Sequence, residues 1–400
     1  MKRIHFLLLL ILFWVARNTI LVRQRDTGSF AAVDSMALLQ VASIFLLFGS
    51  FLFFYPKLSF RTVKNIVKSP VLWFFLLYIL GLISALWSPL FNYSVYRAFE
   101  SLVLFFAIFI YFNYMLNDTN IERRFLRFIL ILLLFTFLGQ LKLHGFSISI
   151  ESLHTNSYSF VALILFLYCI GEIVSKSNKT LKRKKMLKKY AWAGLLFVVL
   201  GTSAATNISL IIGLATLALL TNRNDFRIAF IAFLLVVAPL FILMGDMDTI
   251  QEILFPGKSV ESITTMTGRM NLWDQYIMMI YERPYFGWGF AVIARIAEHA
   301  TTNTHNSILS ILSGMGFFGG MIFLIFLIRS LISVFINRKH KNIGTIGSGI
   351  ALIAALANSM SIAVIGESAS PATLSFVALI SFYYLRVAGR NINQDMHKES

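Results

Sequence analysis

The chain has 400 residues, of which 58% are hydrophobic and 13% charged, with a mean hydropathy of +0.77 and a formal net charge of +17. Soluble domains are usually about 45–50% apolar, so this composition excludes an ordinary soluble protein. Apolar runs of about twenty residues recur, and each is long enough to cross a bilayer as a helix. The single cysteine, Cys169, excludes an internal disulfide and a multi-cysteine metal site. We therefore expect an all-α polytopic membrane protein with one membrane domain, residues 1–400.

Twelve segments have the length and apolar character of membrane helices. They are residues 4–22, 32–55, 70–87, 95–116, 124–142, 156–174, 190–205, 207–221, 226–244, 316–336, 345–364 and 371–387. The first follows a basic head and resembles a signal peptide, which we interpret as an uncleaved helix. The third begins at Pro70, a good first helical residue. The seventh and eighth should form a tight hairpin.

The positive charge is unevenly distributed, and its position argues against nucleic acid as a partner. Every second loop is rich in Lys and Arg, namely 56–69, 117–127, 175–189 and 337–344. Cytoplasmic loops carry such an excess, so this alternation predicts an inner (cytoplasmic) membrane protein with both termini in the cytoplasm. The eight basic residues of 175–189 could instead bind a partner or anionic lipid; we favour a topology anchor.

The same topology places residues 245–304 outside, between spans nine and ten. This loop has four basic and seven acidic residues, opposite in sign to the whole chain. About sixty residues is long for a bare connection, so we expect amphipathic helices within it. One is predicted over 269–282, ended by Pro284. Its apolar face would hold Trp273, Tyr276, Ile277 and Ile280, and it would lie along the membrane surface.

Two residues of this loop could carry chemistry. Arg269 opens the predicted helix, and its guanidinium could hold two oxygens of a pyrophosphate in a way that lysine cannot copy; the plain alternative is an interface anchor. His305 precedes the next helix, which Asn303 or Thr304 could cap. A helix start disfavours imidazolium, so a neutral His305 could act as a general base; the plain alternative is a solvated loop histidine.

Further candidates surround these two. Asn306 could bind substrate or orient His305. Arg283 and the turn at Gly287-Trp288-Gly289 could shape the pocket, although a simple chain reversal fits equally well, and Trp288 could stack on a sugar or sit in the interfacial belt. Other external basic residues that could hold phosphates are Arg97, Arg17 and Lys142. Arg97 could simply pair with Glu100, three residues later.

Motifs along the chain resemble a known family. They are SALWSPLFNYSVYRAFE (84–100), HTNSYS (154–159), TGR (267–269), RPYFGWG (283–289) and HNSILSILSGMGFFGG (305–320). In this order they resemble the O-antigen polymerase and O-antigen ligase superfamily over about three quarters of the chain. The resemblance implies a GT-C-like membrane glycosyltransferase with an external active site. It also implies His305 as catalytic base, Arg269 as pyrophosphate ligand, and roles for His154 and Asn156.

The resemblance further implies the substrates. The donor would be a glycan on undecaprenyl pyrophosphate, and the acceptor either another carrier-linked repeat (polymerase) or lipid A-core (ligase). The motifs at 84–100 and 154–159 are more similar to exopolysaccharide polymerases, which favours the polymerase, with a chain-length regulator as a possible partner. No cofactor or metal is required, because arginines can stabilise the leaving pyrophosphate; Asp246 and Asp248 form the only close external acidic pair.

Two observations leave room for other interpretations. Ala204 and Ala205 stand where the family often has a basic residue in the hairpin between spans seven and eight. A transporter or flippase is the alternative of another class. Transporters usually show inverted repeats and acidic residues at membrane depth; no inverted repeat is evident here, and Glu100 is the main acidic candidate.

Overall fold

The computed structural model describes residues 2–21, 35–54, 67, 69–116, 118–146, 148–149, 153, 155–175, 180–221, 269–296, 304–337 and 344–396. All regular secondary structure in these ranges is helical, as the sequence predicts. The helices are α1 (Lys2–Thr19), α2 (Ser35–Phe54), α4 (Val71–Ile83), the 3-10 helix η2 (Ser84–Trp87), α5 (Phe91–Tyr114), α6 (Ile121–Leu143), α8 (Asn156–Val174), α9 (Leu181–Leu200), α10 (Ala204–Leu220), α14 (Arg269–Glu282), α15 (Ile293–Ile296), α16 (Ser307–Ile336), α17 (Thr345–Asn358) and α18 (Pro371–Met396).

The apolar helices make this an integral membrane protein. Four of those described, α5, α6, α8 and α16, are long and apolar enough to cross a membrane. Six shorter apolar helices lie at other predicted spans: 4–19, 38–51, 71–87, 204–220, 345–358 and 371–387. The predicted span 226–244 lies outside the described residues, so the count of twelve stays a prediction.

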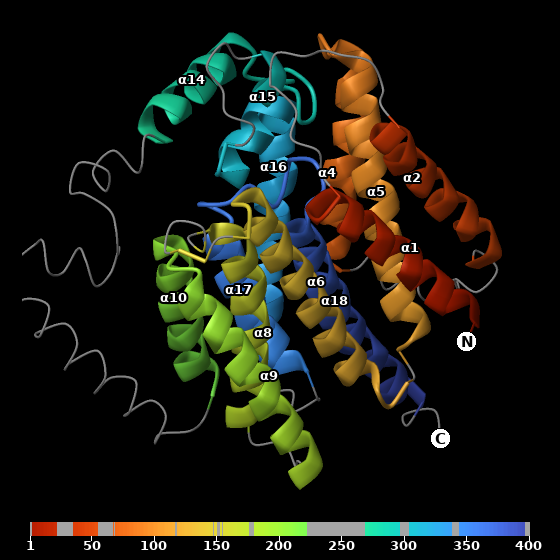
Figure 1. Cartoon of the computed structure of the whole chain (residues 1–400), viewed down its shortest axis with the longest axis vertical. Coiled ribbons are helices and arrows are strands. Elements are labelled where there is room, and N and C mark those ends of the chain that lie inside the picture. The colour runs from red at the N-terminus through yellow and green to blue at the C-terminus, as the bar shows by residue number, and fades with distance from the viewer. Residues whose placement is uncertain are drawn as a thin grey trace, which may run out of the picture.

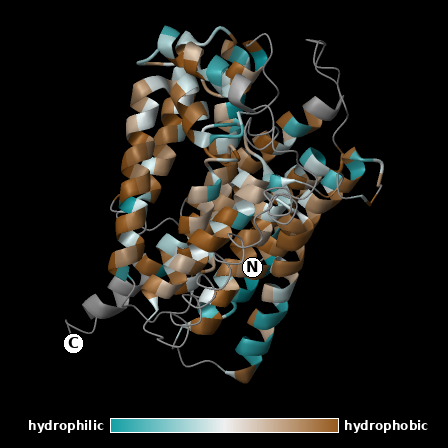
Figure 2. Cartoon of the chain, turned by 90° about the vertical axis from the view of Figure 1, so that its left-hand side faces the viewer, coloured by the Kyte–Doolittle hydropathy of each residue, from teal (hydrophilic) through white to brown (hydrophobic). Residues whose placement is uncertain are grey.

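The helices pack as a bundle that is apolar in the middle and polar toward its two opposite ends. Helix α8 packs against α6, α9, α10 and α17, while α16 packs on α4, and α18 on α5 (Figure 1). Apolar residues cover the helix midsections and polar residues gather toward the two ends (Figure 2). Helices α14 and α15 lie at one end of the bundle, and the basic first turns of α9 lie at the other (Figure 1).

The lysine-rich stretch 180–189 is helical, which corrects the predicted loop. Helix α9 starts at Leu181 because Thr180 caps it by accepting from the backbone N–H of Arg183, and Lys and Arg are good helix formers. Arg183 itself is not a solvated topology anchor. Its guanidinium bonds Glu122 of α6 at 2.7 Å and Glu172 of α8 at 2.6 Å, so it clamps three helices together.

Helix α16 is broken at Gly316, where φ is 61° and ψ is −158°. The break leaves carbonyl groups without their usual helical N–H partners, and the turn at 284–289 supplies them: Trp288 N–H donates to the carbonyl of Ser313 at 2.9 Å, and Gly289 N–H to that of Gly314 at 2.8 Å. In return, Phe317 N–H donates to the carbonyl of Pro284 at 2.7 Å. The loop and the broken helix therefore satisfy each other's backbone groups.

We predict that Gly316→Ala destabilises the protein by roughly 1–3 kcal/mol or more, because a Cβ would stand 2.3 Å from the backbone of Tyr285 at a positive φ. Gly49→Ala is the matched control, since its Cβ would meet nothing within 4 Å inside a helix. Thermal unfolding of the purified variants measures both changes. Equal melting temperatures for the two variants would contradict the prediction.

Candidate functional site

Helix α14 has the predicted bounds and covers one side of the candidate site. Its buried face, however, holds Leu272 and Tyr276, which cluster with Ile293 of α15. Ile277, predicted on the apolar face that lies along the membrane surface, is 40% exposed, so its contact with the membrane stays a prediction. The i, i+4 spacing of Leu272 and Tyr276 turns one stripe toward the bundle. Arg269 is the first residue of α14; its side chain lies outside the described residues.

Arg283 and Trp288 support the turn that follows α14. The guanidinium carbon of Arg283 lies 3.9 Å from the centroid of the Trp288 ring, a cation–π contact. The indole N–H of Trp288 donates to the carbonyl of Met279 at 2.9 Å. These contacts hold the chain reversal and cover a face of the indole, so they favour the structural interpretation of both residues.

The loop before α16 has a constrained backbone. Thr304 is buried, and Trp273 of α14 donates to its carbonyl at 3.1 Å. His305 is partly buried and has φ 53°, in the left-handed region that few non-glycine residues adopt. Strain of this kind concentrates at functional sites.

Asn306 is the N-cap of α16, so the predicted caps Asn303 and Thr304 are wrong. Its side-chain oxygen accepts from the backbone N–H groups of Ile308 and Leu309 at 2.9 and 3.2 Å. The Thr304 hydroxyl lies between the Asn306 backbone, whose N–H donates to it at 3.1 Å, and the carboxyl group of Glu367. The Asn306 oxygen is thus committed to the helix, which leaves its amide nitrogen as the group that could donate to a substrate.

Glu367 is a candidate residue that the sequence predictions missed. It lies in the loop between α17 and α18, and its Oε1 accepts from Ser310 at 3.0 Å and from the Thr304 backbone and hydroxyl at 3.4 and 3.3 Å. Burial raises the pKa of Glu367 to about 7, against the lowering effect of these bonds. An acid between two apolar spans is a signal that could have identified it.

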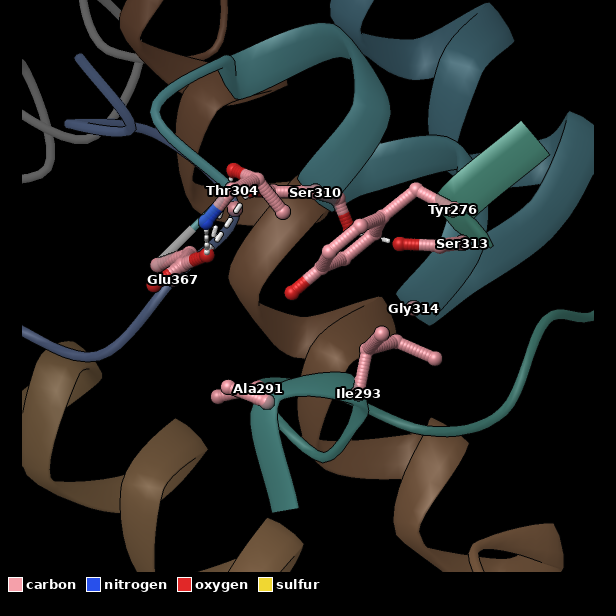
Figure 3. Close-up of a pocket in the computed structure, with 10 residues that line it drawn as sticks. Tyr276, Ala291, Ile293, Thr304, Ser310, Ser313, Gly314 and Glu367 are labelled. Atoms are coloured by element: carbon pink, nitrogen blue, oxygen red, sulfur yellow. Dashed lines mark hydrogen bonds between the residues drawn. The ribbon is translucent and has the colours of Figure 1, made fainter. Parts of the chain in front are cut away.

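These groups line one small pocket (Figure 3). Its walls come from α14, the turn before α15, the first half of α16 and the loop after α17. The polar lining is Tyr276, Thr304, Ser310, Ser313 and Glu367. In Figure 3 the Tyr276 hydroxyl points into the space that Glu367 and Thr304 border. The structure therefore joins the residue before His305 to a titratable carboxyl group.

Two arginines contact the ring of Tyr93. Arg97 pairs with Glu100 at 2.9 Å, as the sequence suggests. Its guanidinium carbon lies 5.3 Å from the centroid of the Tyr93 ring, and that of Arg295 lies 5.2 Å from the same centroid. Arg295 follows Ala294, which lines the pocket. Because α15 brings it here, Arg295 is a second basic candidate that sequence spacing did not single out.

The remaining candidates from the sequence that the structure describes do not line this pocket, and hydrogen bonds join them to other parts of the protein. Arg17, in the last turn of α1, bonds Asn18 at 3.2 Å, and Lys142 donates to the carbonyl of Ile20. Asn156 joins α8, α10 and α17: it donates to Asn358 at 3.1 Å and accepts from Thr206 at 2.9 Å.

His154, Asp246 and Asp248 lie outside the described residues. Within the described ranges no group of three or more His, Cys, Asp or Glu could hold a metal ion. Glu100 accepts from Trp14 at 2.9 Å and pairs with Arg97, so this acid at membrane depth is engaged by protein partners.

We predict a pH-dependent stability from Glu367. An unfolded glutamate titrates near 4.3, below the folded value of about 7. Between these values the folded state holds the extra proton, so stability falls as pH rises. Glu367→Gln removes the titration, and its melting temperature should exceed that of the wild type at pH 8, with a gap that narrows toward pH 5. Exposed Glu282→Gln is the control; a gap that stays constant with pH contradicts the assignment.

Comparison with known proteins found a family match over most of the residues that line this pocket. Residues 190–324 match a family described as O-antigen ligase. The matched range runs from α9 into α16 and contains α14, the turn at 284–289 and the His305 loop. No curated protein matches the chain. The family match over these residues supports the resemblance of the motifs to the O-antigen polymerase and ligase superfamily.

Proposed function

We propose that the protein is a metal-independent membrane glycosyltransferase with a GT-C-like fold that extends a polysaccharide at the external face of the cytoplasmic membrane. The donor is a glycan on undecaprenyl pyrophosphate. The observation that carries the proposal is that the family match covers α14 and the His305 loop together, and that these two segments contact each other through Trp273 and Thr304.

The transfer breaks the bond between the donor sugar and its pyrophosphate and forms a bond from the acceptor oxygen to the sugar. His305 takes the proton of the acceptor hydroxyl. The pyrophosphate leaves with the bonding electrons, and Arg269 stabilises its charge with two parallel hydrogen bonds. Arg295 follows the lining residue Ala294, and Arg97 contacts the same Tyr93 ring as Arg295. These two arginines supply further positive charge to the leaving group, in place of the basic residue missing at Ala204.

The acceptor distinguishes two candidates. The motifs at 84–100 and 154–159 favour a polymerase of repeat units, while the description of the matched family, O-antigen ligase, favours transfer to lipid A-core. A strain lacking the protein separates them on a polysaccharide gel. Single-repeat lipopolysaccharide indicates a lost polymerase, whereas carrier-bound chains with bare core indicate a lost ligase.

A transporter would need an ion or lipid gradient, and an enzyme would not. Purified protein in liposomes without any gradient, supplied with lipid-linked repeats, should therefore lengthen the glycan. If the glycan does not lengthen, and an imposed gradient instead moves the lipid across the bilayer without a new glycosidic bond, the protein is a flippase and not an enzyme.

The first prediction concerns topology. Basic loops set orientation, so Lys184 in α9 should be cytoplasmic and Tyr281 in α14 external. After Cys169→Ser, single cysteines at these exposed positions are treated on intact spheroplasts with a membrane-impermeant thiol reagent. We expect labelling at position 281 only; labelling at 184 only would invert the topology and remove the external site.

The second prediction concerns Arg269. Because bidentate binding needs the planar guanidinium, Arg269→Lys should lose transfer nearly as fully as Arg269→Ala. Arg127→Lys, exposed on α6, is the matched control and should stay active. Transfer is measured with protein reconstituted at equal membrane levels. Full activity of Arg269→Lys would reduce the role to simple electrostatics.

The third prediction concerns His305. Removing a general base typically lowers the rate by about a hundred- to ten-thousand-fold. His305→Gln and His305→Ala should therefore insert normally and bind the lipid-linked donor but lose nearly all transfer in a single turnover. His5→Gln, at the start of α1, should match the wild type. Substantial turnover in His305→Gln would show that the histidine is not the base.

A further inference from the structure

The pocket under α14 contains a buried hydroxyl without a partner. Tyr276 is 1% exposed, and its hydroxyl makes no hydrogen bond with the protein. A buried polar group without a partner is costly. This hydroxyl points into the pocket rather than into packed side chains (Figure 3). It can both donate and accept a hydrogen bond, and it is therefore available to a ligand in the pocket.

Across the pocket, the carboxyl group of Glu367 can accept further hydrogen bonds. The hydrogen bonds that it accepts from Ser310 and Thr304 all go to its Oε1 atom. A carboxyl group has two oxygens and about four lone-pair positions. Glu367 acts on Tyr276 electrostatically, since its charge adds to burial in raising the pKa of that phenol. The two groups therefore share the free space between them.

The chemistry of the lining selects the kind of ligand. Among the residues that the structure describes, the pocket is lined by hydroxyl groups, a carboxyl group and apolar residues, and by no Lys, Arg or His. A carboxylate repels phosphate, and no lining cation offsets that repulsion. The space itself is about the size of a water molecule or a hydroxyl group. A single neutral hydroxyl fits both constraints.

We propose that Tyr276 and Glu367 form a subsite for one non-reacting hydroxyl group of the acceptor sugar. The Tyr276 hydroxyl donates to the sugar oxygen, and Glu367 accepts from the sugar hydroxyl. This inference rests on the proposed glycosyl transfer and assigns the pocket to the acceptor. The pyrophosphate belongs on the neighbouring side, where Arg97 and Arg295 approach Tyr93.

The subsite also explains how the acceptor would be aligned. Glu367 holds Thr304, and Thr304 is joined to His305 through the peptide bond. A sugar hydroxyl bound by Glu367 therefore lies close to the His305 loop and orients a neighbouring hydroxyl toward the proposed base. A site built to bond a hydroxyl rejects analogues that lack it, so this pocket sets acceptor specificity.

The test uses full-length protein in liposomes, lipid-linked repeats as donor, and a synthetic repeat-unit glycoside without pyrophosphate as acceptor. Tyr276→Phe should raise the KM for the acceptor by about 3- to 10-fold, the worth of one hydrogen bond, and leave the donor KM and kcat within about twofold. Without substrate its melting temperature should equal or exceed that of the wild type, because an unpaired buried hydroxyl is gone. Tyr281→Phe, the same change at an 80% exposed position of α14, should change nothing.

Glu367→Gln is the second variant, since its amide oxygen can still accept from Ser310 and Thr304; its acceptor KM should rise with the donor KM unchanged. Deoxy analogues of the acceptor sugar locate the bonded hydroxyl: one analogue should bind weakly to wild type and lose nothing further in Tyr276→Phe. An unchanged acceptor KM in Tyr276→Phe means that the pocket holds only water, and an equal rise in donor KM assigns it to the donor; either result overturns the subsite alone. Absence of transfer by the wild type would overturn the proposed function and the subsite with it.

Discussion

The site depends on the backbone pairing between the turn at 284–289 and the break in α16. A helix interrupted inside a membrane protein exposes N–H and C=O groups that no water can satisfy. Here the backbone N–H groups of Trp288 and Gly289 donate to carbonyls of α16, and the N–H of Phe317 donates to the carbonyl of Pro284. The exchange is possible because Gly287 and Gly316 adopt positive φ values and approach the opposite backbone without a Cβ. It fixes α14 over the start of α16, and the pocket is the space enclosed between them.

Charged side chains are held by different interactions at the two ends of the bundle. At the end with α9, Arg183 is drawn into the protein by Glu122 and Glu172, and this ion cluster ties α6, α8 and α9 together. At the end with α14, Arg97 and Arg295 both contact the ring of Tyr93, and Arg97 is also paired with Glu100. Glu367 lies in a pocket whose described lining holds no cation. The anionic donor and the neutral acceptor alcohol of the proposed reaction would therefore meet different surroundings.

In the His305 loop, folding contacts hold the residues on both sides of the proposed base. The side-chain oxygen of Asn306 caps the N-terminus of α16. Thr304 is held by Glu367 and by Trp273 of α14. Between these two anchored residues the backbone of His305 is forced to φ 53°. A side chain on such a fixed backbone loses little freedom when a substrate arrives, which is what a proton acceptor requires.

The sequence by itself determined the helical membrane character, the bounds of α8 and α14, and the restart of α16 after Gly316, because apolar runs, Pro284 and glycine act locally. It also pointed to the family that the chain resembles, because the order of motifs can be compared without coordinates. Tertiary structure decided what depends on residues far apart: Glu367 under Thr304, Arg295 beside Arg97, and Arg183 bound to two distant acids. Helical periodicity could not say which stripe of α14 packs against the protein, because that stripe is chosen by contacts with α15 and α16 rather than by the helix itself.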